Sequence, residues 1–249
     1  MATKDHQSEP IESASETLQR IFDGHGSVLG SQMADESSRY DVLKKTDFPK
    51  PQRTRRIAVA NQKGGVGKTT STVNTAAALA NKGAQVLVID MDPQGNASTA
   101  LGVSHASGEP SVYDVIEGRS DLGDVITVCP DFPTLDVVPA SIDLSGAELE
   151  VADLPNRNTL LKEALDLYLR QSDKHYDYVF IDCPPSLGLL VINAMCAVTE
   201  MLIPIQAEYY ALEGLGQLIN TIGLVQEHFN PVLLVSTMLV TMFDRRTLL

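Results

Sequence analysis

The chain has 249 residues, 43% of them hydrophobic but only 5% aromatic, and a formal net charge of −13 at pH 7. This composition allows a sizeable, mostly aliphatic core, and the length fits one α/β domain with or without a tail. The acidic excess excludes nucleic-acid binding by bulk attraction, so any such contact requires a local basic cluster.

The charge is distributed unevenly along the chain. Residues 1–56 hold nine basic and nine acidic side chains, which leaves ten of the 19 basic and 23 of the 32 acidic residues for 57–249. The N-terminal part is therefore neutral, and the remainder carries the whole acidic excess.

Several classes of protein are disfavoured by what the sequence lacks. No stretch of about 18 apolar residues and no apolar N-terminal signal segment is present, which predicts a soluble cytoplasmic protein for which membrane association is unlikely. The three cysteines, Cys129, Cys183 and Cys196, do not have metal-ligand spacing. Their odd number favours buried free thiols over a disulfide framework.

Residues 1–55 are expected to form a polar tail that ends in a basic linker. The segment 1–46 is rich in Ser, Gln, Asp and Glu and has too little apolar surface to fold alone, so we expect it to be mostly disordered. Four apolar residues could form a short partner-docking helix, the alternative being a solvated tail: Ile11, Leu18, Ile21 and Phe22.

The linker carries six basic residues, namely Lys44, Lys45, Lys50, Arg53, Arg55 and Arg56. Pro49 and Pro51 favour an extended backbone here. The run is either a solvated linker or a contact for DNA phosphates or anionic lipid.

A phosphate-binding loop is predicted directly after this linker. The apolar run 57–60 is typical of a buried parallel strand. Gly64, Gly65 and Gly67 follow, and they allow backbone N–H groups to turn toward an anion. From Lys68 onward, apolar residues recur at helical spacing, so the positive end of a helix points at the loop.

The strict phosphate-loop pattern GxxxxGK[ST] fails at Gln62, and Lys63 adds a second lysine. The run KGGVGKTT resembles the deviant Walker A motif of the ParA/MinD/NifH group of ATPases. The resemblance implies that Lys68 binds the phosphates of its own nucleotide and that Thr69 is a ligand of Mg²⁺. It also implies that Lys63 reaches the nucleotide of a partner subunit.

The same resemblance implies ATP and Mg²⁺ as cofactors and a set of nucleotide-binding residues: Gly64, Gly65, Val66, Gly67, Lys68, Thr69 and Thr70. The implied fold class is α/β, with a mostly parallel twisted sheet flanked by helices, the P-loop NTPase fold.

Two aspartates follow the next predicted strand, 85–90. Asp90 ends the strand and Asp92 lies in the following loop, at the sheet edge where ligands bind in open α/β folds. In the resembled family Asp92 is required for hydrolysis, so it completes the catalytic set with Lys63 and Lys68. Asp90 is expected to support the Mg²⁺ shell or the loop, and the alternative is that both are turn or cap residues.

The middle of the chain is expected to be scaffold. We predict helices near 112–116, from 141 onward and over 160–169, with short strands at 125–128 and 135–138. No chemical role is apparent for His105, His175 or His228, which are expected at the surface.

A third strong strand, 178–182, ends on Asp182 and matches a Walker B element, which would orient Mg²⁺ through a water. Together with Thr69, Asp182 forms the predicted metal site. The segment DCPP that begins at Asp182 resembles ParA proteins rather than MinD.

After a helix at 187–197 and a strand at 201–205, the run QAEYYALEG at 206–214 resembles chromosomal ParA/Soj proteins. Tyr209 and Tyr210 there are either interface residues or packed on the sheet. A helix at 215–228 and a strand at 232–240 complete the pattern.

The family continues beyond this point, which implies an ATPase domain, 56–249, that lacks its C-terminal end. Arg245 and Arg246 lie where Soj-like proteins keep DNA-contacting residues, although a surface pair without function is the alternative.

The resemblance implies a chromosome or plasmid partition ATPase. Its ATP-dependent homodimer would bind DNA without sequence preference, place the protein at the nucleoid and be stimulated by a ParB-type centromere-binding partner. The alternative within the group is a MinD-like or cargo-positioning ATPase that docks on a membrane or a protein scaffold. A non-catalytic module is a third possibility, but it has no need of Lys63, Lys68, Asp92 and Asp182 together.

Overall fold

The computed structural model describes residues 28–208 and 211–244. The chain divides into two compact units, 1–49 and 50–249, which are described separately below. Tyr209, Tyr210, Arg245, Arg246 and the four apolar residues of the proposed docking helix lie outside the described residues.

The first unit contains a helix, α2 (Val28–Lys45), in a segment that was expected to be mostly disordered. Its side chains from Asp35 to Lys45 are exposed. Its apolar residues do not gather on one helical face, so the sequence has no amphipathic pattern that predicts the helix. Lys44 and Lys45 occupy the last turn, where positive charge favours the exposed carbonyl end of a helix. The division of the chain into a tail and an ATPase domain stays a prediction.

The second unit is built on a seven-stranded sheet with the order β3-β4-β2-β5-β1-β6-β7. The strands are β1 (Arg55–Val59), β2 (Val86–Asp90), β3 (Thr127–Val128), β4 (Leu135–Val138), β5 (Tyr178–Asp182), β6 (Glu200–Gln206) and β7 (Leu234–Thr241). Within this sheet only β3 pairs antiparallel, to β4. The predicted α/β class with a mostly parallel sheet is confirmed.

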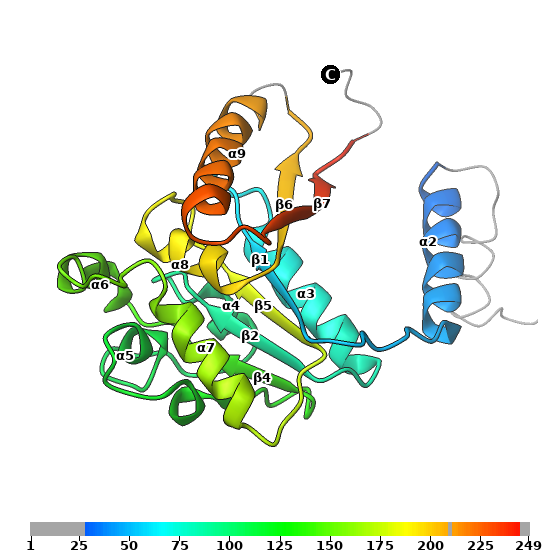
Figure 1. Ribbon diagram of the computed structural model, residues 1–249. Helices are drawn as coiled ribbons and strands as arrows, with labels where there is room; N and C mark the ends of the chain where they lie inside the picture. The colour runs from blue at the N-terminus through cyan, green and yellow to red at the C-terminus, as the bar shows by residue number, and fades with distance from the viewer. Residues whose placement is uncertain (1–27, 209–210, 245–249) are drawn as a thin grey trace, which may run out of the picture. The chain divides into compact units, whose positions relative to one another are not determined.

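Helices cover both faces of the sheet, and Figure 1 shows α3 on the opposite side from α7. The helices are α3 (Lys68–Asn81), α4 (Asn96–Ala100), α5 (Val112–Ile116), α6 (Leu144–Glu150), α7 (Leu160–Gln171), α8 (Leu189–Ala197), α9 (Ala211–His228) and the 3-10 helix η1 (Leu122–Val125). Helix α4 is not predicted from the sequence, and Val125, the last residue of η1, was expected to begin a strand.

The core is split by the sheet into two layers. Val86 and Val88 of β2 pack with α3, whereas Leu87 and Ile89 pack with the helices on the other face. All five residues of β2 are buried. A strand covered on both faces needs apolar side chains at every position, which is why these strands appear in the sequence as continuous apolar runs.

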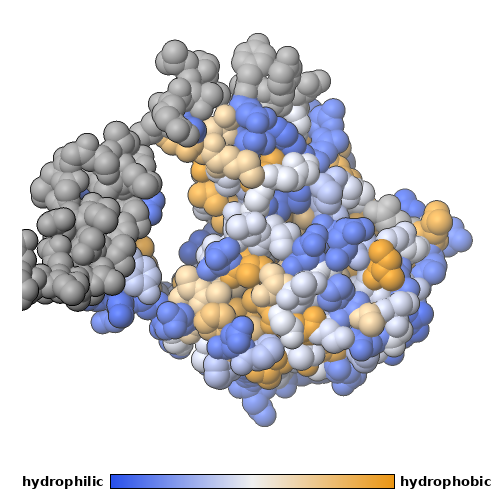
Figure 2. Space-filling model, turned by 180° about the vertical axis from the view of Figure 1, so that it is seen from behind, coloured by the Kyte–Doolittle hydropathy of each residue, from blue (hydrophilic) through white to orange (hydrophobic). Residues whose placement is uncertain are grey.

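The last strand, β7, is less covered than the others. It forms an edge of the sheet, and Leu234, Met238 and Val240 are exposed to 50% or more. Figure 2 shows the molecule from behind, and hydrophobic side chains reach the surface in that view. The adjoining α9 packs on the core through Leu218 and Ile222.

The basic linker lies partly within the sheet. Arg55 and Arg56 belong to β1, where they pair with Glu200 and Asp166, and Lys50 pairs with Asp177. These three charges are therefore held by acidic partners of the same chain rather than forming a continuous basic surface.

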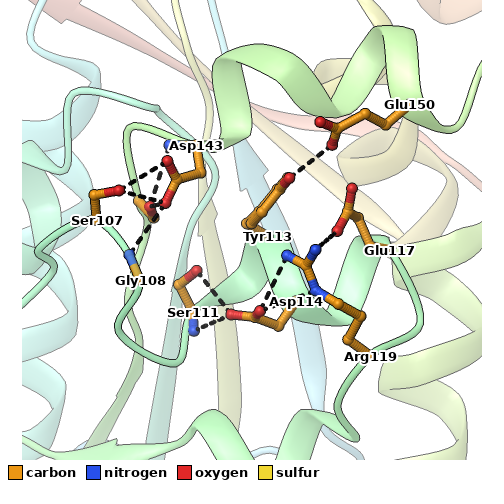
Figure 3. Close-up of polar contacts among 10 residues, drawn as sticks. Ser107, Gly108, Ser111, Tyr113, Asp114, Glu117, Arg119, Asp143 and Glu150 are labelled. Atoms are coloured by element: carbon orange, nitrogen blue, oxygen red, sulfur yellow. Dashed lines mark hydrogen bonds and ion pairs between the residues drawn. The ribbon is translucent and has the colours of Figure 1, made fainter.

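A polar network on the scaffold joins α5 to α6 (Figure 3). The Tyr113 hydroxyl donates to Glu150 Oε2 at 2.7 Å, and the Arg119 guanidinium stacks on the Tyr113 ring while pairing with Asp114 and Glu117. The bond to the Glu150 carboxylate raises the pKa of Tyr113 to about 12. These residues tie two short helices together at the surface.

All three cysteines are buried free thiols, as predicted. His175 and His228 are exposed, but His105 is half-buried, which corrects the prediction for that residue. Its ring packs on Gly95, and its Nε2 lies 2.8 Å from Thr99 Oγ1. No helix in the described part of the chain is long and apolar enough to cross a membrane.

Candidate nucleotide-binding site

The glycine loop connects the carboxyl end of β1 to the first residue of α3, as the sequence predicts. Gly65 and Gly67 have φ values of 72° and 88°, a region that side-chain-bearing residues rarely adopt. Gly64 and Gly65 are exposed and would meet nothing within 4 Å if a Cβ were added, so the space beside them is open. The amides of the first turn of α3 have no partner within the helix, and amides of this kind can bind an anion.

Lys68 is the first residue of α3 and only 7% exposed. Its ammonium donates a 3.1 Å hydrogen bond to the Lys63 carbonyl, within the same loop. Burial lowers the pKa of Lys68, while the charges of Asp182 and Asp92 act in the opposite direction. The loop thus holds a largely desolvated positive charge between carboxylates, where phosphate oxygens would be bound strongly.

Asp182 lies at the carboxyl end of β5, beside the start of α3. The Thr69 hydroxyl donates to Asp182 Oδ2 at 2.7 Å, and the Thr72 hydroxyl lies 2.8 Å from Oδ1. Burial, together with the nearby charges of Asp90 and Asp92, raises the pKa of Asp182 to about 7, although the two hydroxyl hydrogen bonds act in the opposite direction.

Thr69 and Asp182 present hard oxygen donors, the type that Mg²⁺ prefers. The described residues contain no group of three or more His, Cys, Asp or Glu side chains that could hold a metal by themselves. A magnesium ion at this place would therefore share its coordination between these two residues, water and the phosphates of a nucleotide.

Asp90 is fully buried next to Asp182, its register partner in the sheet. Its carboxylate accepts hydrogen bonds from the Ser98 amide at 2.8 Å, the Ser98 hydroxyl at 2.7 Å and the Asp92 amide at 3.1 Å. Burial raises the pKa of Asp90, and the three donors act against that effect. Of the two roles expected for Asp90, this geometry favours support of the loop.

Asp92 lies in that loop and is 7% exposed. Asp92 Oδ1 accepts the Gln94 amide at 3.0 Å, and its carbonyl accepts the Gly95 amide at 2.8 Å. Its charge also influences the pKa values of both Lys68 and Asp182. Asp92 therefore shapes a turn and also lies close enough to Lys68 and Asp182 to influence their charges. The structure is thus compatible with both alternatives from the sequence, a turn residue and a residue of the nucleotide site.

Lys63 is bound within its own chain. Its ammonium donates to Glu208 Oε2 at 2.7 Å, and its amide donates to Asn61 Oδ1 at 2.9 Å. The residue expected to reach a partner subunit is thus held at the rim of the loop by the end of β6.

Thr70 occupies the first turn of α3 and is exposed. The structure therefore places Gly64 to Thr70, Asp92 and Asp182 at one edge of the sheet, as the motifs predict, while the roles of these residues stay predictions.

Sequence reasoning misses several residues of this site. The Asn61 amide group donates to the Pro204 carbonyl at 2.7 Å, and the Thr241 hydroxyl donates to the Val66 carbonyl at 2.9 Å. Thr72 could have been found, because it follows Lys68 and Thr69 by about one helical turn. Glu208 and Thr241 have no such local signal, since they reach the loop only through the order of β1, β6 and β7.

Three features define this chain as a P-loop nucleotide-binding protein. They are a buried lysine at the start of a helix, a glycine loop after a parallel strand, and an aspartate on the neighbouring strand. A family model described as an AAA domain matches residues 54–235.

The sporulation initiation inhibitor protein Soj of Bacillus subtilis is 51% identical over 191 residues, which cover 77% of this chain and 74% of Soj. The chromosome partitioning protein ParA of Caulobacter vibrioides is 46% identical over 190 residues, or 76% of this chain and 70% of that protein.

A similar solved structure is cobyrinic acid a,c-diamide synthase from Mycobacterium smegmatis with bound ADP and magnesium. It aligns with a TM-score of 0.72 and 40% identity, covering 78% of this chain and 77% of that one. The chain belongs to the ParA/Soj family of P-loop ATPases, which confirms the resemblance inferred from its motifs.

Proposed function

We propose that this protein is a partition ATPase that binds ATP with Mg²⁺, dimerises around the nucleotide and hydrolyses it. The observation that carries the proposal is the pair of lysines on one phosphate loop, with Lys68 buried inside the loop and Lys63 at its rim. The chromosome partitioning protein ParA of Caulobacter vibrioides, at 46% identity, favours this role over amide synthesis, since the synthase structure is 40% identical.

Hydrolysis of a phosphoanhydride depends mainly on positioning and on neutralisation of charge. The loop amides, the start of α3 and the Lys68 ammonium supply the positive field. Thr69 and Asp182 would hold Mg²⁺, which supplies further neutralisation of the phosphates when bound. The bound ADP and magnesium of the similar synthase structure support these cofactors.

Asp92 would orient the attacking water, and its position in the loop that leaves β2 at the same edge of the sheet supports this role. Lys63 would contact the nucleotide of a second subunit, so that catalysis depends on dimerisation. ATP then holds two subunits together until it is hydrolysed.

The further parts of the proposal concern partners. The ATP dimer would bind DNA without sequence preference and so reside on the nucleoid, and a ParB-type protein would stimulate hydrolysis and release the DNA. Arg245 and Arg246 are the candidate phosphate contacts. The support for these steps is the family membership and the chromosome partitioning role named for ParA of Caulobacter vibrioides.

The test is retention of random duplex DNA by the Asp92→Ala protein, with ATP and with ADP, over a salt titration. Blocking hydrolysis should accumulate the dimer, so we expect retention with ATP only, and this retention should weaken steeply with salt. An exposed aspartate outside the site provides the matched control, Asp131→Ala, which should behave as the unmodified chain does.

If DNA is retained in neither nucleotide state although ATP binds, the proposed DNA partner is wrong. The same protein should then be tested on vesicles and protein scaffolds. Replacing both Arg245 and Arg246 by Glu should abolish DNA retention and leave ATP binding intact.

A further inference from the structure

The Lys63 side chain has a partner in its own chain that is 145 positions away in the sequence. Its Nζ donates to Glu208 Oε2 at 2.7 Å. The other carboxylate oxygen of Glu208 accepts the Gln206 side-chain amide at 2.5 Å. Both oxygens of Glu208 are therefore engaged, and Gln206, the last residue of β6, helps to fix the direction of the carboxylate.

The backbone of Lys63 is fixed independently of this ion pair. Its amide donates to Asn61, its carbonyl accepts the Lys68 ammonium, and Asn61 is in turn bonded to the Pro204 carbonyl. Only the side chain of Lys63 remains free to change direction. Two positions of its ammonium can therefore be exchanged by rotamer changes without rebuilding the loop.

The pair is open to solvent, with side-chain exposures of 36% for Lys63 and 48% for Glu208. Exposed ion pairs of this kind are weak, and at low salt they change the ratio of the two Lys63 positions by about two- to five-fold. Such a pair can bind Lys63 in the isolated subunit, and a multiply charged phosphate group from a second subunit can replace it.

We propose that Glu208 is a positioning residue that holds Lys63 in its own subunit and competes with the nucleotide of the partner subunit for the Lys63 ammonium. This inference rests on the proposed ATP dimer and adds a residue that sets how readily the dimer forms. Removing the charge of Glu208 frees Lys63 and strengthens dimerisation.

The variant for the test is Glu208→Gln, which keeps the shape of the side chain and an acceptor for Gln206. The matched control is Glu200→Gln, because Glu200 lies at the start of β6 and also forms an ion pair, with Arg55 at 2.6 Å, at the other end of the strand from the loop. The dimer dissociation constant is measured by sedimentation with a non-hydrolysable ATP analogue, at about 50 mM and about 1 M salt.

We expect Glu208→Gln to lower the dimer dissociation constant about two- to five-fold at low salt and to have no effect at high salt, where the pair is screened. Glu200→Gln should match the unmodified chain. In a Lys63→Ala background, Glu208→Gln should change nothing, because the competition acts only through that lysine.

Unchanged or weaker dimerisation of Glu208→Gln overturns the inference, as does an effect that persists in the Lys63→Ala background. Failure of the unmodified chain to dimerise with the analogue would instead overturn the proposed ATP dimer and this inference with it. The two failures are thus distinguished by the unmodified protein.

Discussion

Thr69 and Asp182 lie 113 positions apart in the sequence, and a 2.7 Å hydrogen bond joins the Thr69 hydroxyl to Asp182 Oδ2. The contact links the first turn of α3 to the end of β5 and places a carboxylate whose pKa is raised to about 7 at the rim of the phosphate loop. A bound divalent cation favours the ionised form of such a carboxylate. Metal binding and pH therefore both change the charge of the Asp182 carboxyl.

The raised pKa of Asp182 predicts a pH-dependent stability in the absence of metal. A carboxyl with a folded-state pKa above its ordinary 3.8 favours folding while it is protonated, and this contribution is lost as pH rises through about 7. The Asp182→Asn protein cannot ionise here. Its free energy of unfolding should exceed that of the unmodified chain by roughly 2–4 kcal/mol at pH 8 and by much less at pH 5.

Urea unfolding of both proteins in a chelator, from pH 5 to 8, measures this difference. Parallel pH profiles would show that Asp182 titrates in the ordinary range in the folded protein.

Lys68 should be required for nucleotide binding and not for folding. Lys68→Ala removes the buried ammonium that faces the inner side of the loop, and we expect affinity for ATP to fall at least about 100-fold, as for loss of charge-assisted hydrogen bonds. A fluorescent nucleotide titration measures this. Lys162→Ala, on α7, is the control and should bind normally, and circular dichroism should report the same helix content in both variants.

Asp90 and Asp92 should differ sharply although they are two residues apart. Asp90→Ala leaves three buried donors, on Ser98 and Asp92, without their acceptor, and we expect a loss of about 2–4 kcal/mol in the free energy of unfolding. Asp92→Ala should stay within about 1 kcal/mol of the unmodified chain, bind ATP and lose hydrolysis. Denaturation curves and phosphate release distinguish the two, and equal destabilisation would contradict the assignment of loop support mainly to Asp90.

Gly95 should tolerate no side chain. It has a φ of 64°, and an added Cβ would lie within 3.0 Å of His105 Nδ1, so Gly95→Ala should cost about 1–3 kcal/mol of stability. Adding His105→Ala removes the steric part of this cost but leaves the backbone strain. A double-mutant cycle by urea unfolding should therefore show partial recovery, and strict additivity would mean that His105 does not press on Gly95.

The sequence by itself determined the parts of this protein that follow from local pattern. The buried parallel strands are continuous apolar runs because both faces of the sheet are covered, and Lys68 and Thr69 adjoin the glycine loop in the chain itself. Asp92 and Asp182 follow predicted strands, and the carboxyl ends of parallel strands meet at one edge, so their meeting with the loop could be expected.

The tertiary structure alone decided the features that depend on which strands become neighbours. Glu208 reaches Lys63 and Thr241 reaches Val66 only because β6 and β7 lie beside β1 in the strand order, and no local motif encodes that order. The helix α2 was not predicted because its apolar residues do not gather on one helical face. Asp90 and Asp92 lie in the same motif, so the sequence alone does not show which of the two is structural. The hydrogen bonds from Ser98 to Asp90 identify Asp90 as the structural carboxylate and leave Asp92 as the catalytic candidate. Ser98 is eight residues away, and it reaches Asp90 only because the chain turns between them.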